Sequence, residues 1–128
     1  MLEVGIKGND EIKVVAENTA KSVGSGMLEV FATPAMIALM EKTASESVMP
    51  YLDEGEGTVG ISLNVRHVSA TPIGLTVFCE SELVEIDRKR LVFSVKASDE
   101  KGLIGEGTHE RFVINNEKFM EKTIAKLG

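Results

Sequence analysis

One segment organises the rest of the chain: Phe31-Ala32-Thr33-Pro34-Ala35-Met36-Ile37-Ala38-Leu39-Met40-Glu41-Lys42-Thr43-Ala44. A threonine followed by a proline and a run of helix formers is typical of a helix start. The hydroxyl can cap a free backbone N–H, and a proline at the first helical position loses no hydrogen bond. From Ala35 to Ala44, apolar residues lie on nearly every side of the helical wheel. This pattern predicts a buried central helix from about Pro34 to Leu52.

The helix carries one carboxylate, Glu41, inside its apolar run. Burying a glutamate costs several kcal/mol unless the charge is paired or neutralised. We interpret Glu41 as catalytic. The alternatives are a structural glutamate paired with a neighbouring cation and a glutamate on an exposed stripe of the helix.

Outside the helix, apolar residues recur at every second position, which predicts strands. We expect a first, edge strand over residues 11–17 and four more over residues 59–68, 75–86, 91–98 and 103–114. Tight turns join most of these strands, so they must be antiparallel, and the long helix has only their sheet to pack against. The sequence therefore predicts an α+β fold in which an antiparallel sheet wraps around one helix.

Three smaller features complete the predicted layout. Gly105 and Gly107 share one face of the last strand, which would let the helix backbone approach closely. The two glycines of residues 23–27 indicate a flexible loop. Asn115-Asn116 can cap a short C-terminal helix over residues 117–127, with Phe119 and Ile124 as its anchors.

Length and composition indicate a single domain over residues 1–128. The net charge of −6 argues against a nucleic-acid partner, and the longest apolar runs are too short to span a membrane. The N-terminus lacks the pattern of a secretory signal, and the single Cys79 fits a cytoplasmic protein with a buried thiol. The two histidines and one cysteine lie far apart in the sequence, so no metal site is expected.

The order of elements looks like the hotdog fold, in which a curved antiparallel sheet wraps a central helix and two protomers pair their sheets. Over about residues 31–119, the sequence resembles the fluoroacetyl-CoA thioesterase-like branch of hotdog thioesterases. The motifs that carry the resemblance are Val30-Phe31-Ala32-Thr33, Leu39-Met40-Glu41, Pro50-Tyr51-Leu52, Gly55-Glu56-Gly57, His67, Ala70-Thr71-Pro72, Gly74-Leu75-Thr76-Val77 and Gly107-Thr108-His109-Glu110-Arg111.

The resemblance implies a set of site residues. The family's catalytic threonine at the helix start, glutamate inside the helix and histidine on the following strand fall on Thr33, Glu41 and His67. A glycine at the position of Gly60 lies near the acyl group in the family. The resemblance also implies an acyl-CoA partner, a homodimer that can assemble further, and no cofactor, because the CoA moiety is part of the substrate.

Geometry limits how these residues can cooperate. Eight residues along a helix span about 12 Å, so Thr33 and Glu41 of one chain cannot easily reach one reacting carbon. Our hypothesis is a site at the dimer interface that uses residues of both protomers. His67 shares a face with Ile61, Leu63 and Val65, so it is either a satisfied core histidine or the polar partner of Glu41.

The sequence gives less evidence for the roles of the other polar residues. We interpret His109 as structural and Arg111 as a substrate-binding residue that meets either the CoA phosphates or a carboxylate. The cluster Arg88-Lys89-Arg90 is either a solvated turn or a second contact for the CoA phosphates.

Fluoroacetyl-specific enzymes carry aromatic lid residues before the helix, whereas residues 23–28 of this chain contain none. This difference predicts a short- or medium-chain natural acyl group in place of fluoroacetyl. The leading hypothesis is an acyl-CoA thioesterase, and the alternative is a non-catalytic acyl-CoA-binding or regulatory hotdog module.

Overall fold

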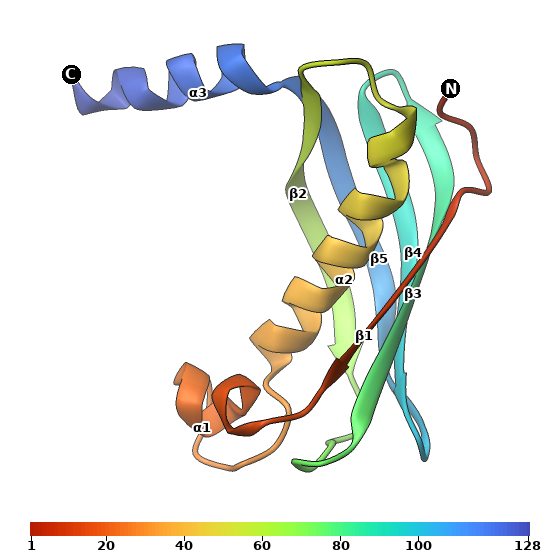
Figure 1. Cartoon of the computed structure of the whole chain (residues 1–128), viewed down its shortest axis with the longest axis vertical. Helices are drawn as coiled ribbons and strands as arrows, with labels where there is room; N and C mark the ends of the chain where they lie inside the picture. The colour runs from red at the N-terminus through yellow and green to blue at the C-terminus, as the bar shows by residue number, and fades with distance from the viewer.

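The computed structural model describes all 128 residues and contains one five-stranded sheet with a long helix across its concave face (Figure 1). The strands lie in the order β1-β3-β4-β5-β2, and every neighbouring pair is antiparallel. The predicted α+β architecture is confirmed, with the strands at β1 (Lys7–Lys13), β2 (Glu56–His67), β3 (Thr76–Asp87), β4 (Arg90–Asp99) and β5 (Gly102–Asn115).

The core lies between the helix α2 (Thr33–Val48) and the inward side chains of the sheet. On the helix, the buried residues follow the three- and four-residue spacing of one face, namely Met36, Leu39, Met40, Thr43, Ala44 and Val48. On β3 and β4, alternate residues are buried against them, namely Val77, Cys79, Leu83, Leu91, Phe93, Val95 and Ala97.

The opposite side of α2 is open, so the expectation of a helix buried on nearly every side is wrong. Pro34 and Ala38 are exposed, and Glu41 and Ser45 are only partly covered. A single sheet can cover only one side of a helix, and in one chain nothing else reaches these positions. This stripe of α2 is therefore left uncovered by the chain's own residues.

Contrary to expectation, Thr33 does not cap the helix. The N-cap is Ala32, which has no side-chain capping bond, and Thr33 is the first helical residue with Pro34 following it. The helix ends at Val48 and continues as a 3-10 turn, Met49–Tyr51, that contains Pro50. The Thr33 hydroxyl is therefore available for a hydrogen bond outside the helix.

The first strand begins four residues earlier than predicted, at Lys7. It ends where it does because the Asn18 side chain accepts a hydrogen bond from the Val15 N–H and donates one to the Lys13 carbonyl, both at 3.0 Å. These bonds turn the chain into a short 3-10 helix, Ala16–Asn18.

A short helix, α1 (Ala20–Val23), precedes the predicted loop and shares only Val23 with it, while residues 24–27 are irregular, as expected. The Thr19 hydroxyl accepts a hydrogen bond from the Ser22 N–H at its start, and Gly24 ends it in the left-handed conformation. The chain then crosses to α2 beside the end of β2.

The C-terminal helix α3 (Asn116–Ile124) is capped as predicted, because the Asn115 side chain accepts a hydrogen bond from the Lys118 N–H at 2.9 Å. Its expected anchors do not hold it to the sheet: Phe119 and Ile124 are 38% and 54% exposed. The helix projects from the end of β5 (Figure 1). None of the helices is long and apolar enough to cross a membrane.

The two glycines on β5 have different roles. A Cβ at Gly105 would lie 2.5 Å from the Met36 sulfur, so this glycine does let the helix approach, as predicted. At Gly107 a Cβ would overlap the Asn64 carbonyl oxygen and lie 2.6 Å from the Val65 Cα. The second glycine therefore accommodates the backbone of β2, and the expectation that it faces the helix is wrong.

We expect Gly107→Ala to lower the free energy of unfolding by about 2–3 kcal/mol, because backbone atoms cannot move aside for the added methyl group. Urea denaturation followed by circular dichroism measures this change. Gly26→Ala is the control, since a Cβ there meets only the Ala20 Cβ at 3.3 Å. Equal stability of the two variants would contradict the packing at Gly107.

Candidate active site

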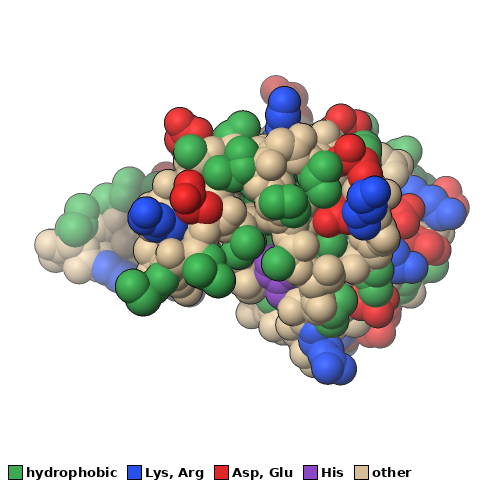
Figure 2. Space-filling model, turned by 90° about the horizontal axis from the view of Figure 1, so that it is seen from below, with side chains coloured by type: hydrophobic (Ala, Val, Ile, Leu, Met, Phe, Trp, Pro, Cys, Tyr) green, Lys and Arg blue, Asp and Glu red, His purple; other side chains and the backbone are tan.

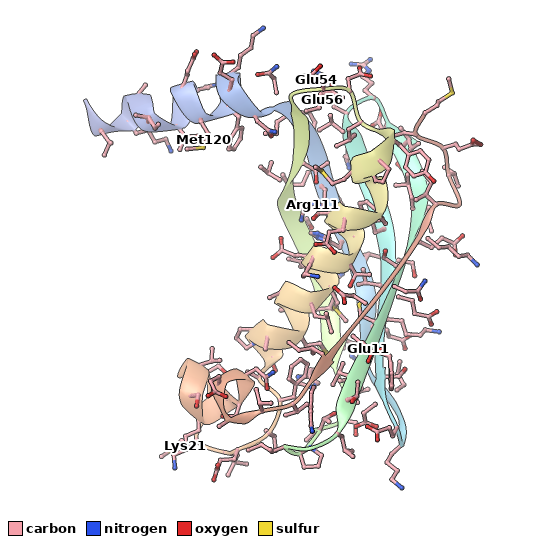
Figure 3. All side chains as sticks on the ribbon, viewed as in Figure 1. Glu11, Lys21, Glu54, Glu56, Arg111 and Met120 are labelled. Carbon is pink, nitrogen blue, oxygen red and sulfur yellow. The ribbon has the colours of Figure 1, made fainter.

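The Glu41 carboxylate is held by an arginine from the neighbouring sheet. Its Oε2 accepts a hydrogen bond from Arg111 Nη1 at 3.2 Å. Figure 3 shows Arg111 in the region between α2 and the sheet, and this residue is 7% exposed. The Glu41 side chain is 39% exposed. Glu41 is thus a paired, half-exposed carboxylate, and the expectation that it is buried is wrong.

The remaining donors of Arg111 are fixed by β2. Its Nε donates to the Thr58 hydroxyl at 2.8 Å, and Nη2 donates to the Thr58 carbonyl at 3.0 Å. With these bonds and its bond to Glu41, the guanidinium is occupied inside the protein. Arg111 is expected to contact either the CoA phosphates or a carboxylate, and the structure contains a carboxylate contact, with Glu41. Its side chain is not displayed on the surface as a phosphate-binding group would be.

Gly60 lies directly against the Glu41 carboxylate. A Cβ at this position would overlap Glu41 Oε2 and would lie 3.3 Å from Arg111 Nη1. A β-bulge follows between Gly60 and Ser62, where the pairing of β2 with β5 shifts by one residue. The missing side chain leaves room for the carboxylate against the strand.

Behind Arg111 lies His109, which is fully buried and stacked on Phe93 with ring centroids 6.2 Å apart. Its Nδ1 lies 2.9 Å from the Ser62 carbonyl oxygen, and its Nε2 lies 3.1 Å from Arg111 Nη1. Burial lowers the pKa of His109, and the neighbouring Arg111 charge lowers it further. This residue has no contact with the surface.

A second polar pair, Thr33 and His67, lies at the start of α2. Thr33 Oγ1 and His67 Nδ1 are 2.8 Å apart. The turn into α2 is fixed by backbone bonds: the Phe31 N–H donates to the Thr71 carbonyl at 2.8 Å, and the Ala32 N–H donates to the Asn18 carbonyl at 2.9 Å. These bonds place Thr33 beside the last residue of β2.

His67 is partly buried, and its Nε2 atom is inaccessible to solvent yet has no hydrogen-bond partner in the chain. Burial lowers the pKa of His67, so the ring is neutral at pH 7. A hydrogen bond to the Ser69 backbone opposes this shift. Figure 2 shows a histidine at the surface among hydrophobic side chains; this is His67, because His109 is fully buried.

The Thr33–His67 pair lines a pocket of about 290 Å³. Its other walls come from the segment before α2 and from the end of β2, and they are mostly small or apolar: Ala20, Ser25, Val30, Phe31, Val68, Ser69 and Ala70. Met27 and Leu28 are 89% and 68% exposed and do not line this pocket. A pocket of this size and lining suits a small, largely apolar group.

Within one chain, the structure brings Thr33 to His67 and brings Glu41 to Gly60, but it does not join the two pairs. Thr33 and Glu41 are separated by about 12 Å along α2, and Gly60 and His67 by about 23 Å along β2. Each pair holds part of the predicted site.

Sequence reasoning missed Thr58 and the bonded link between His109 and Arg111. Two features point to this link. Residues 109 and 111 are two positions apart on one strand, so they share a face of β5, and Gly60 pairs with Arg111 across the sheet. In the turn 88–90, Arg90 is held by Glu85 and Glu110, whereas Arg88 and Lys89 are exposed. These bonds to acidic groups raise the pKa of Arg90.

Comparison with known proteins gives consistent results. The family model described as fluoroacetyl-CoA-specific thioesterase matches residues 14–117. The fluoroacetyl-CoA thioesterase of Streptantibioticus cattleyicolor is 47% identical over 98 residues, which are 77% of this chain and 70% of that protein. The family match spans α2, the sheet from β2 onward and both polar pairs.

Solved structures agree over nearly the whole chain. The structure of the fluoroacetyl-CoA thioesterase FlK has a TM-score of 0.93 at 38% identity and covers 98% of both chains. A threonine-to-serine variant of FlK in complex with acetyl-CoA has a TM-score of 0.94 at 37% identity, covering 99% of this chain and all of that one. A thioesterase superfamily member from Thermus thermophilus has a TM-score of 0.88 at 28% identity, covering 98% and 92%. This chain has the hotdog fold and belongs to the fluoroacetyl-CoA-specific thioesterase family.

Proposed function

We propose that this protein hydrolyses the thioester bond of a short-chain acyl-CoA as a homodimer, in which each site combines Glu41 of one protomer with Thr33 and His67 of its partner. Membership of a thioesterase family supports the reaction. One observation carries the composite site: within one chain Thr33 and His67 lie together at 2.8 Å, whereas Glu41 lies beside Gly60, about 12 Å farther along α2. A second chain could bring its own Glu41 to the Thr33–His67 pair.

The sheet offers a way to pair two chains. β2 is the terminal strand of the sheet, it is twelve residues long, and nothing in the chain covers its outer edge. An edge of this length is a template for pairing with another strand. Ile61 and Leu63 on this strand are 51% and 36% exposed.

The register of such a pair follows from the two half-sites. If two β2 strands run antiparallel about the midpoint between Leu63 and Asn64, Gly60 lies opposite the partner's His67. Paired strands are about 4.8 Å apart. Because Glu41 lies against Gly60, this register brings its carboxylate toward the partner's Thr33–His67 pair.

The chemistry of thioester hydrolysis suits these groups. Glu41 either attacks the thioester carbonyl to give an anhydride or removes a proton from the attacking water. In the base route, the proton that water loses to Glu41 passes to the CoA thiolate as the C–S bond breaks. In the anhydride route the C–S bond breaks first, and water then cleaves the anhydride, releases the acid and Glu41, and supplies the proton for the thiolate. The Thr33–His67 pair can relay that proton. Thr33 also lies at a helix start, where developing negative charge is stabilised. Hydrolysis in labelled water tests for the anhydride, since water that attacks its glutamyl carbonyl places the label in Glu41, which the general-base route never does.

Further features of the proposal concern the substrate and the setting. Gly60 gives the acyl group access to Glu41, and Arg111 acts on the substrate through the charge it places beside that carboxylate. The small pocket favours a short acyl group over a medium-chain one. We propose that no cofactor takes part and that the protein is cytoplasmic.

The first test is release of CoA thiol from a panel of acyl-CoA esters that includes acetyl, fluoroacetyl, medium-chain and aromatic acyl groups. We expect the highest kcat/KM with the shortest acyl groups, because the pocket of about 290 Å³ limits the acyl chain. Binding of the same esters without any thiol release would instead support the alternative, a non-catalytic acyl-CoA-binding or regulatory module.

A further inference from the structure

We propose that His109 is a positioning residue for Glu41: in its neutral Nδ1–H tautomer it holds Arg111, and Arg111 holds the carboxylate. The inference rests on the proposed role of Glu41. It assigns a part in the reaction to a fully buried side chain that touches neither the substrate nor the surface.

The hydrogen-bond partners of His109 define its tautomer. Nδ1 faces the Ser62 carbonyl oxygen at 2.9 Å, and a carbonyl oxygen can only accept. Nε2 faces Arg111 Nη1 at 3.1 Å, and a guanidinium can only donate. Both bonds form together only when Nδ1 carries the proton and Nε2 carries the lone pair.

The same Arg111 nitrogen, Nη1, bonds both His109 and Glu41. The chain of contacts therefore runs from the Ser62 carbonyl through the imidazole and the guanidinium to Glu41 Oε2. Thr58 holds the other two Arg111 nitrogens. Without His109, the end of the guanidinium that carries Glu41 would lose its second fixed partner.

His109 also fixes the backbone of β2 beside the Glu41 carboxylate. Ser62 lies on the far side of the β-bulge from Gly60, and the His109 Cε1 atom is 3.3 Å from where a Gly60 Cβ would lie. One imidazole thus sets the position of Arg111 and the path of the backbone at Gly60. These are the two groups that contact the Glu41 carboxylate.

A proton on Nε2 would break this arrangement, because it would place two donors and two positive charges face to face. The charged groups around the imidazole are Arg111, Glu41 and Glu110, and its flat face is covered by Phe93. Burial and Arg111 both lower the pKa of His109, which keeps the ring neutral at pH 7, whereas the bond to the Ser62 carbonyl and the two glutamates oppose this shift.

Two substitutions test the role in turnover. His109→Phe keeps the ring against Phe93 and removes both hydrogen bonds, while His109→Gln keeps an amide oxygen that can accept from Arg111. We expect His109→Phe to lower kcat about 100-fold with KM nearly unchanged, the scale of a 1 Å misplacement of a reacting group. The kcat of His109→Gln should be at least tenfold higher than that of His109→Phe. Thermal melting confirms that both variants fold.

NMR of the imidazole nitrogens tests the network without turnover, since the chain has only two histidines and His109→Phe assigns their signals. We expect the Nδ1–H tautomer for His109. Its pKa should rise in Arg111→Met and fall in Glu41→Gln, because the first change removes a positive charge and the second a negative one. The change in kcat of His109→Phe and its recovery in His109→Gln distinguish positioning from a purely structural role. The Nε2–H tautomer, an unaltered pKa in both variants, or unchanged kcat in His109→Phe would overturn the inference. Absence of thiol release by the wild type would instead overturn the proposed function.

Discussion

Glu41→Gln is expected to reduce kcat for thioester hydrolysis by about 10²–10⁴-fold, the range over which a positioned acid or base accelerates a reaction. Glutamine has nearly the same shape and can still accept the hydrogen bond from Arg111 Nη1. It cannot attack a carbonyl as a carboxylate does, nor can it remove a proton from water. The loss should therefore appear in kcat, with substrate binding largely retained.

The matched control is Glu46→Gln on the same helix. The Glu46 side chain is 60% exposed, and its bonded partner is Lys42, away from both polar pairs. We expect this variant to keep kcat within about twofold of the wild type and the same melting temperature, as is usual for exposed positions. Thiol release and circular dichroism measure both quantities. Equal activity of the two variants would remove Glu41 from the reaction.

The order of the five strands and the long helix can be predicted from the sequence, because the spacing of the apolar residues shows which face of each element is buried. The alternating apolar residues of β3 and β4 point into the core, as expected. The first strand is harder to place, because β1 reads Lys-Gly-Asn-Asp-Glu-Ile-Lys and has little apolar signal. Its position depends on contacts distant in sequence: it pairs with β3, and a Cβ added at Gly8 would lie 2.8 Å from the Thr43 carbonyl oxygen.

The candidate site is predictable only in part. Thr33, Glu41 and His67 are identified through the family resemblance, but Ala32 takes the capping position that the sequence suggests for Thr33. A helical wheel does not distinguish apolar residues that face the chain's own core from those that face another chain. For this reason the pattern predicts burial for the open stripe of α2 and an anchoring role for the exposed Phe119.

The bonds of Arg111 are beyond local prediction because they join three elements. Its partners lie on α2, on β2 and on β5 itself, at sequence separations of up to 70 residues. Met120 illustrates a related limit: it lies on the projecting helix α3, away from the sheet (Figure 3), although its spacing fits an amphipathic helix. Local pattern indicates which face is apolar, and only the tertiary arrangement shows what that face meets.

The composite site makes a second strong prediction, for mixed dimers of Thr33→Ala and Glu41→Gln. Each variant alone should be nearly inactive, because each lacks one half of both sites. In a mixed dimer, one site combines Thr33 and His67 of the Glu41→Gln chain with the Glu41 of the other chain. That site is intact, and the second site carries both substitutions.

With random exchange, half of the dimers are mixed and half of their sites are intact, so about one quarter of wild-type activity should return. Mixing Thr33→Ala with His67→Ala is the control, because those two residues act from the same chain and no intact site can form. Thiol release after co-refolding of each pair is the measurement that tests the account most directly. Recovery of about one quarter of the activity in the first mixture alone is the expected result. Equal inactivity of both mixtures, in dimers shown to have exchanged subunits, would contradict a site shared between protomers.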